Sequence, residues 1–166
     1  IPMADSNLAA TLTTTRFRRP VLEDNVVNAK AGCLYPNNAR MLYEARNKGY
    51  SNALVLDAMG NVAETATANI FMCKDGEVFT PIPNGTFLAG ITRNRHIYNL
   101  RKNGICVNEC VLQVSDFLSA DEVFMSGNMM KVTPVAKFQN KVYPTGRIAA
   151  LARDLYWDWA LSEKGM

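Results

Sequence analysis

The sequence predicts one mixed domain of the α+β class. Its length of 166 residues is that of a single domain. The expected strands outnumber the expected helices, and several neighbouring strands are joined by short turns of the hairpin type. Such an order favours a mixed sheet over a strict alternation of strand and helix.

The composition excludes several classes of protein. Hydrophobic residues make up 48% and charged residues 20%, as in ordinary globular chains, and 9% of the residues are aromatic, which argues against disorder. No apolar run approaches the roughly 20 residues of a membrane span. The net charge of +3 comes without a basic block. We therefore expect neither a membrane nor a nucleic acid as a partner.

The first elements follow from local patterns. Residues 1–7 show no periodicity and are expected to form a linker. The β-branched run at 8–15 predicts a strand. The basic cluster at 16–20 is expected to be its solvated end, with an anion site as the alternative. Helical spacing of apolar residues predicts a helix over 36–48, stopped by Gly49.

The remaining elements are predicted in the same way. Short apolar runs separated by turn residues predict strands at 52–57, 69–73, 77–80, 105–112, 122–126, 131–138 and 141–143. Helices are expected at 92–103, in a short segment opened by Ser115, and from about Thr145 to near the end of the chain. The residues before 69, including Glu64, are expected to form a loop at a strand end.

Familiar catalytic constellations are missing from the sequence. It contains no phosphate-binding P-loop, no dinucleotide fingerprint and no nucleophile elbow. The single histidine, His96, is expected to pack on its helix or lie at the surface, which leaves little support for a hydrolase. His96 also cannot complete a usual zinc set, so no metal is expected. The four cysteines form no C-x-x-C pair, and without a signal-type leader we expect free thiols and a cytoplasmic location.

Four loops at strand ends carry the remaining chemistry, at 29–35, 64–69, 90–93 and 126–129. Lys30 stands among small residues, where desolvation would favour the neutral amine of a Schiff-base lysine; a surface lysine is the alternative. Glu64 is expected to be a cap or the partner of a buried cation. The loop at 90–93 precedes a helix and can cradle an anion. A lysine, a carboxylate and two phosphate-type cradles together suggest pyridoxal 5'-phosphate.

These segments resemble the class IV aminotransferases, the pyridoxal-phosphate enzymes of fold type IV. The family pattern is matched by the fixed positions within 64–71, by Val78-Phe79-Thr80 and by the run at 88–93. Segments at 30–35 (KAGCLY) and 120–127 (ADEVFMSG) are similar to the branched-chain branch of the family. The likeness extends over roughly residues 10 to 147.

The resemblance implies the fold and the organisation of the protein. Residues 8–166 would form the large, cofactor-binding domain, with a mostly antiparallel sheet or pseudo-barrel flanked by helices. Residues 1–7 would be the linker to a smaller N-terminal domain that this sequence lacks. Family members are homodimers in which the small domain supplies most substrate-side residues, so we expect a homodimer and an incomplete enzyme.

The resemblance also implies the cofactor-binding residues. Lys30 stands where the family has the lysine that bonds to the cofactor aldehyde and then acts as base and acid. Tyr35 matches the phenol that hydrogen-bonds the ring oxygen, and Glu64 the carboxylate that faces the pyridine nitrogen. Ile91 and Thr92 match the phosphate cradle.

The turn at 126–129 supplies the remaining contacts that the resemblance implies. Asn128 stands where branched-chain enzymes have a phosphate-binding threonine, and an amide can donate there as well. Tyr35, Asn128 and Met129 would bind the substrate, the last through its backbone N–H group beside the substrate carboxylate.

The function implied is transfer of an amino group between an amino acid and a 2-keto acid. Branched-chain amino acids are candidates, although Thr65 and Ala68 replace the glycine and glutamate of the usual branched-chain motif. One alternative is a lyase similar to aminodeoxychorismate lyase, which releases pyruvate. Another is a binding domain without activity.

Overall fold

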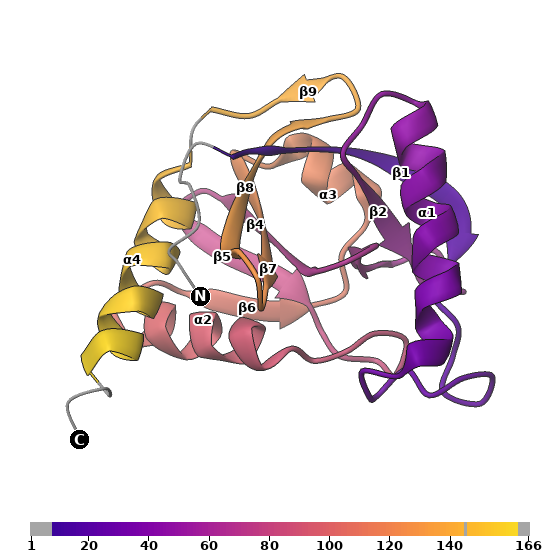
Figure 1. Cartoon of the computed structure of the whole chain (residues 1–166). Helices are drawn as coiled ribbons and strands as arrows, with labels where there is room; N and C mark the ends of the chain where they lie inside the picture. Colours follow the sequence, from indigo (N-terminus) through magenta and orange to yellow (C-terminus); the bar gives the residue numbers. More distant parts are fainter. Residues whose placement is uncertain (1–7, 145, 163–166) are drawn as a thin grey trace.

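The strands form one curled sheet with helices against its outer faces (Figure 1), in a computed structural model that describes residues 8–144 and 146–162. The strands are β1 (Ala10–Arg18), β2 (Asn52–Leu56), β3 (Val62–Thr65), β4 (Asn69–Lys74), β5 (Glu77–Pro81), β6 (Val107–Cys110), β7 (Glu122–Gly127), β8 (Lys131–Phe138) and β9 (Lys141–Val142). The helices are the 3-10 turn η1 (Gly32–Leu34), α1 (Tyr35–Asn47), α2 (Ile91–Lys102), α3 (Val114–Ser119) and α4 (Arg147–Ser162).

The nine-stranded sheet of the described residues has the order β3-β2-β1-β8-β7-β4-β5-β6, with β9 beside β8. The pairs β1–β2, β1–β8 and β5–β6 are parallel, and the other pairs are antiparallel. The backbone N–H of Val62 in β3 donates to the oxygen of Leu112, shortly after β6, so the two ends of the strand order approach each other. The predicted α+β class and the mostly antiparallel, curled sheet are therefore confirmed.

Alternating side chains of the strands build an inner and an outer core. In β4, Ile70 and Met72 point into the curl of the sheet, where Phe117 of α3 joins them. Phe71 and Cys73 point outward, to the cluster beneath α2 and α4. A third cluster packs α1 on β2, with Met41 of the helix completely buried. Because both faces of the sheet are covered there, β2, β4 and β7 are buried at nearly every position.

Most predicted elements are present, and two predictions are wrong. The strand β3 lies within a stretch predicted to be turn and loop, so Glu64 belongs to a strand. The short helix α3 begins after Gln113, whose side chain forms a capping box with Asp116, and does not open at Ser115. The expected linker at 1–7 and the expected helix start at Thr145 lie outside the described residues.

Three general features of the described chain bear on function. None of its helices has the length and apolar character needed to cross a membrane. Within residues 8–144 and 146–162, no group of three or more His, Cys, Asp or Glu side chains could hold a metal ion. The four cysteines are free, and Cys33 and Cys106 are exposed.

Candidate functional site

The loops that precede α1 and α2 meet along one edge of the sheet, the lower edge in Figure 1. A Cβ atom placed on Gly85 would lie 3.9 Å from that of Leu22, so the two loops are in contact. The turn between β7 and β8 reaches the same region, because Gly127 packs against the side chain of Ala68. Segments 60 residues apart in sequence are thus neighbours here, and they include most of the predicted site residues.

Glu64 lies at the base of this region and is buried. Its Oε1 atom lies 3.1 Å from Nη2 of Arg19, the residue that follows β1. Burial raises the pKa of the Glu64 carboxyl to about 7, and the positive charge of Arg19 opposes this rise. Of the two roles that the sequence left open for Glu64, the structure therefore supports the partner of a buried cation.

The Arg19 guanidinium forms hydrogen bonds with three residues besides its ion pair with Glu64. Its Nη1 atom donates to Oδ1 of Asn38 at 2.5 Å, and its Nη2 atom donates to the backbone oxygens of Thr65 and Ala66 at 2.7 and 3.2 Å. The prediction that the basic cluster is a solvated strand end is correct for Arg16 and Arg18 and wrong for Arg19, which is only 5% exposed. Burial lowers the pKa of the Arg19 guanidinium, and Glu64 opposes that effect.

Asn69 links Glu64 to the loop that precedes α2. Its Nδ2 atom donates to Oε2 of Glu64 at 3.3 Å and to the backbone oxygen of Leu88 at 2.8 Å. Its Oδ1 atom lies so close to Gly90 that a Cβ atom on the glycine would collide with it. Sequence reasoning placed Asn69 in the motif without giving it a role, yet this side chain fixes the distance between the carboxylate and the start of α2.

The start of α2 offers free donors. The helix begins after Gly90, whose extended backbone supplies no side-chain cap, and its first intrahelical bond runs from Asn94 N to Gly90 O. The N–H groups of Ile91 and Thr92 therefore have no partner within the helix, and the helix dipole favours an anion beside them. Ile91 is exposed and Thr92 is buried. Their role as a phosphate cradle stays a prediction.

Lys30 and Tyr35 belong to the end of the loop before α1 and to the start of that helix, and Leu22 of the same loop contacts the loop before α2. Lys30 is exposed in the turn before η1, and Tyr35, the first residue of α1, is 54% exposed. Of the two settings that the sequence left open for Lys30, the structure shows the surface lysine in a turn. No hydrogen bond or ion pair within the described ranges joins Lys30 to Glu64. Tyr35 lies one helical turn before Asn38, which holds Arg19 and through it Glu64.

The turn between β7 and β8 completes the region. Asn128 and Met129 are exposed, and the buried hydroxyl of Ser126 has no hydrogen-bond partner among the described residues. The structure therefore brings Glu64, the start of α2 and this turn together, whereas Lys30 and Tyr35 approach from the neighbouring loop. A lysine amine, a buried carboxylate and free anion donors are the groups that pyridoxal phosphate requires, so the residues present fit this cofactor.

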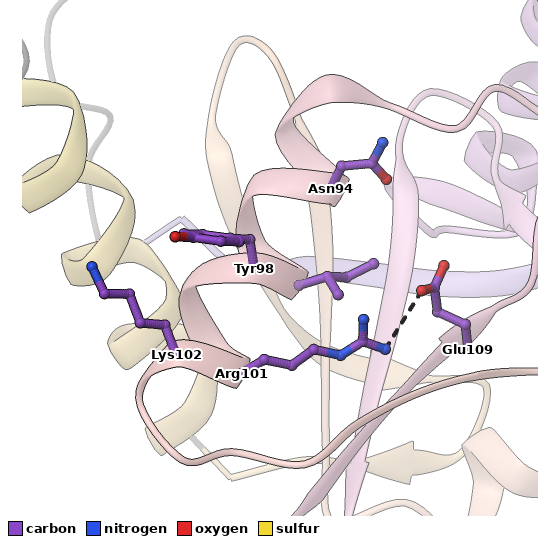
Figure 2. A pocket seen from close by; sticks show the side chains of 6 residues that line it. Asn94, Tyr98, Arg101, Lys102 and Glu109 are labelled. Carbon is purple, nitrogen blue, oxygen red and sulfur yellow. Dashed lines mark ion pairs between the residues drawn. The ribbon is translucent and has the colours of Figure 1, made fainter.

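A separate hollow lies on the outer side of α2 (Figure 2), and it contains none of these residues. Glu109 there pairs with Arg101 at 3.5 Å and with the buried Arg93 at 2.9 Å. The charges of this hollow are thus used within the chain. His96, on the same helix, is completely buried, as the packing alternative predicted, and burial lowers its pKa to about 4.

Comparison with known proteins gives consistent matches. Residues 1–138 match the family described as amino-transferase class IV. A probable branched-chain-amino-acid aminotransferase of Aquifex aeolicus is 38% identical over 136 residues, which are 80% of this chain and 44% of the relative.

Two solved structures match over nearly the whole chain. An aminotransferase from Brucella abortus bound to the cofactor PLP is 58% identical with a TM-score of 0.93, covering 96% of this chain and 57% of that one. A branched-chain aminotransferase from Thermoproteus uzoniensis with norvaline is 30% identical with a TM-score of 0.88, covering 95% and 54%. This chain spans about half the length of the proteins it matches.

Proposed function

The chain belongs to the class IV aminotransferases, and from that premise we propose that it is the cofactor-binding part of a pyridoxal-phosphate-dependent aminotransferase. The observation that carries this proposal is the connection from the Glu64–Arg19 pair through Asn69 to the uncapped start of α2. A carboxylate for a pyridine nitrogen and donors for a phosphate are thereby fixed relative to each other, as one cofactor requires. The Brucella relative bound to PLP supports the same cofactor.

The proposed cofactor contacts follow from the placement of the residues. Lys30 would bond to the aldehyde carbon through Nζ, and Tyr35 would donate its hydroxyl proton to the ring oxygen. Glu64 would accept a hydrogen bond from the protonated pyridine nitrogen. The N–H groups of Ile91 and Thr92, with the Thr92 hydroxyl and the Asn128 amide, would bind the phosphate. When bound, pyridoxal phosphate supplies an electron sink for the bond that breaks at the substrate Cα.

Lys30 would serve a second time as the proton carrier. Once a substrate amine has taken its place at the aldehyde, the freed Nζ atom can accept a proton from the substrate Cα as a general base and return one as a general acid. Exposure of Lys30 in this chain leaves the amine free to move between these positions. The bond to the aldehyde requires a primary amine, which among the side chains only lysine carries, so no other residue type can fill both roles.

Glu64 would act through its negative charge. Burial raises the pKa of this carboxyl to about 7, although a cation lies beside it, so near neutral pH it exchanges between its protonated and ionised forms. A protonated pyridine nitrogen placed against it would be a second positive partner and would favour the ionised carboxylate. Arg19 is a positioning residue in this scheme, because it touches Glu64 and not the cofactor.

For the substrate we propose an aliphatic, branched-chain type of amino acid and its 2-keto acid. The names of the Aquifex and Thermoproteus relatives support this class. Tyr35, Asn128 and Met129 would line the substrate side, and all three are exposed in this chain. That exposure supports the proposal that residues 8–166 are a large domain. A small N-terminal domain, connected through the linker at 1–7 that would follow it in sequence, would cover the site.

For the whole protein we propose a homodimer in the cytoplasm. The exposed apolar surface at Ile91 and Met129, 90% and 76% exposed, is what a covering domain or subunit would bury. Four unpaired cysteines are in keeping with a reducing compartment.

The proposed activity is tested by a half-reaction. The full-length protein is loaded with pyridoxal phosphate and given leucine without a keto acid. An aminotransferase releases one equivalent of keto acid per site and then stops until a 2-keto acid is added. Lys30→Ala is the control and should release none. Release of pyruvate from aminodeoxychorismate would instead support the lyase, and no product from any amino acid would support a binding domain.

A further inference from the structure

Lys131, the first residue of β8, adopts a conformation that lysine rarely takes. Its φ angle is +60°, in the left-handed region where glycine and asparagine are favoured. The residue is only 7% exposed, so its side chain runs into the molecule instead of into water. A lysine that is both buried and left-handed is costly to fold, which points to a role for its side chain.

The ammonium group of Lys131 has a polar partner and an aromatic one. Its Nζ atom donates to Oδ1 of Asn128 at 3.1 Å and lies 5.3 Å from the centre of the Tyr156 ring on α4. Within the described part of the chain, no carboxylate lies close enough to form an ion pair with it. Lys131 therefore brings a positive charge beside the turn that no negative side chain of these residues neutralises.

The backbone of Lys131 fixes this turn to the helix that begins at the proposed phosphate site. The Nε2 atom of His96 on α2 lies 3.1 Å from the backbone oxygen of Lys131. Since a carbonyl oxygen only accepts, Nε2 carries the proton of the neutral imidazole. Moving the turn relative to α2 would break this buried hydrogen bond.

The contact with Asn128 decides which way its amide faces. An ammonium group only donates, so it must meet the amide oxygen and not the amide nitrogen. With Oδ1 occupied by Lys131, the two N–H groups of Nδ2 are directed away from the lysine and remain available as donors. Asn128 itself is exposed at the turn, where a ligand can reach it.

We propose that Lys131 is a positioning residue for the cofactor phosphate. It orients the Asn128 amide so that N–H donors face the phosphate, and it adds an unneutralised positive charge behind that amide. The proposal rests on the proposed function, because it takes the phosphate to lie at the start of α2. It predicts that Lys131 acts on the phosphate alone and not on the pyridine ring or the aldehyde.

The test compares two aldehydes that differ only in the phosphate. The full-length protein is titrated with pyridoxal phosphate and with pyridoxal, and binding is followed by absorbance. In Lys131→Met the dissociation constant for pyridoxal phosphate should rise on the order of tenfold, the size expected for one hydrogen bond to a charged group, while that for pyridoxal stays the same. Lys102→Met, at an exposed lysine of α2, is the matched control and should change neither constant.

A second variant guards against loss of folding in Lys131→Met. Asn128→Asp alters only an exposed side chain, replaces the amide donors by a carboxylate, and should weaken pyridoxal phosphate but not pyridoxal. Lys131→Met should cost less in Asn128→Ala than in the wild-type protein, because the part of its effect that runs through the Asn128 amide is already lost there and only the effect of its charge remains. Equal losses for the two aldehydes, or no loss for either, would overturn the role of Lys131. A wild-type protein that binds neither aldehyde would overturn the proposed function itself.

Discussion

Glu64 and Arg19 determine the charge at the base of the candidate site. The carboxylate is buried where ionisation is unfavourable, and Arg19, 3.1 Å away, is the cation that makes ionisation possible. Without the arginine, the pKa of Glu64 would rise above its value of about 7. The ability of Glu64 to meet a protonated pyridine nitrogen at neutral pH thus depends on a residue 45 positions earlier.

We predict that Arg19→Met shifts the acidic limb of the pH–rate profile to higher pH. Activity at pH 7 should fall on the order of tenfold for each unit by which the Glu64 pKa rises, and should recover as the pH is raised. Arg19→Lys should recover part of the loss, because it restores the charge without the paired donors. A uniform loss at every pH would instead mean that Arg19 acts only on the structure.

The free energy of unfolding of the cofactor-free protein should depend on pH because of the same Glu64 carboxyl group. The pKa of Glu64 lies near its ordinary 4.5 in the unfolded chain and at about 7 in the folded one. Between these values the unfolded state has released a proton that the folded state retains, so the free energy of unfolding falls as the pH rises. Glu64→Gln should lack this decline in urea unfolding from pH 4.5 to 8. Parallel pH profiles for the two proteins would contradict the burial effect.

Single residues of the site could be predicted from sequence where a motif surrounds them. The motifs predict roles for Lys30, Glu64 and Thr92 in this way, and these roles stay predictions. Roles for Arg19 and Asn69 were not predicted, because they depend on contacts with residues far along the chain. Of the two settings left open for Lys30, the surface position is found for a related reason: small neighbours in sequence do not bury a side chain unless another part of the molecule covers it.

At the scale of elements, the start of α2 is held in place by a close contact. Gly90 precedes the helix and has no room for a Cβ atom, since Asn69 Oδ1 occupies that position. The strand β4 begins with Asn69, so the contact ties the helix start to the sheet. The donors of Ile91 and Thr92 are therefore kept at a fixed distance from Glu64.

We predict that Gly90→Ala weakens pyridoxal phosphate binding more than it slows the saturated enzyme. The added methyl group must displace either Asn69 or the helix start, and both carry donors of the site. We expect a loss on the order of tenfold in affinity, with a rate close to the parent at saturating cofactor. Gly104→Ala, with open space around the glycine at the other end of α2, is a control for a mere change in stability. Unchanged affinity in Gly90→Ala would place the phosphate elsewhere.

Elements with strong patterns were predictable, whereas β3 was not. Val62–Thr65 is only four residues long and contains Glu64, so neither length nor alternation marks it as a strand. It is buried because β2 pairs with it on one side and Val62 N donates to Leu112 O on the other. Leu112 lies far along the chain, so the local sequence carries no sign of this second contact.

At the scale of the whole molecule, the chain has a complete core and an open site. Its three buried clusters are contained within the described residues, so we expect the 166-residue chain to fold. The predicted cofactor and substrate residues on its surface are exposed, among them Lys30, Tyr35, Ile91, Asn128 and Met129. Water can reach these groups, and it weakens electrostatic contacts.

We therefore predict that the 166-residue chain alone binds pyridoxal phosphate weakly and transaminates poorly. A longer form that includes the proposed small domain should be a homodimer with high cofactor occupancy and activity. The two forms are compared by cofactor absorbance, turnover and sedimentation. If the short form matches the long one in occupancy and turnover, this chain is self-sufficient and the two-domain proposal is wrong.

The most direct test of the central claim is to find the lysine that carries the cofactor. The full-length protein is loaded with pyridoxal phosphate, reduced with borohydride to fix the bond between lysine and cofactor, and digested for peptide mapping. The account predicts that the pyridoxyl label lies on Lys30 and is lost in Lys30→Ala. A label on another lysine, such as Lys48 or Lys74, would contradict it.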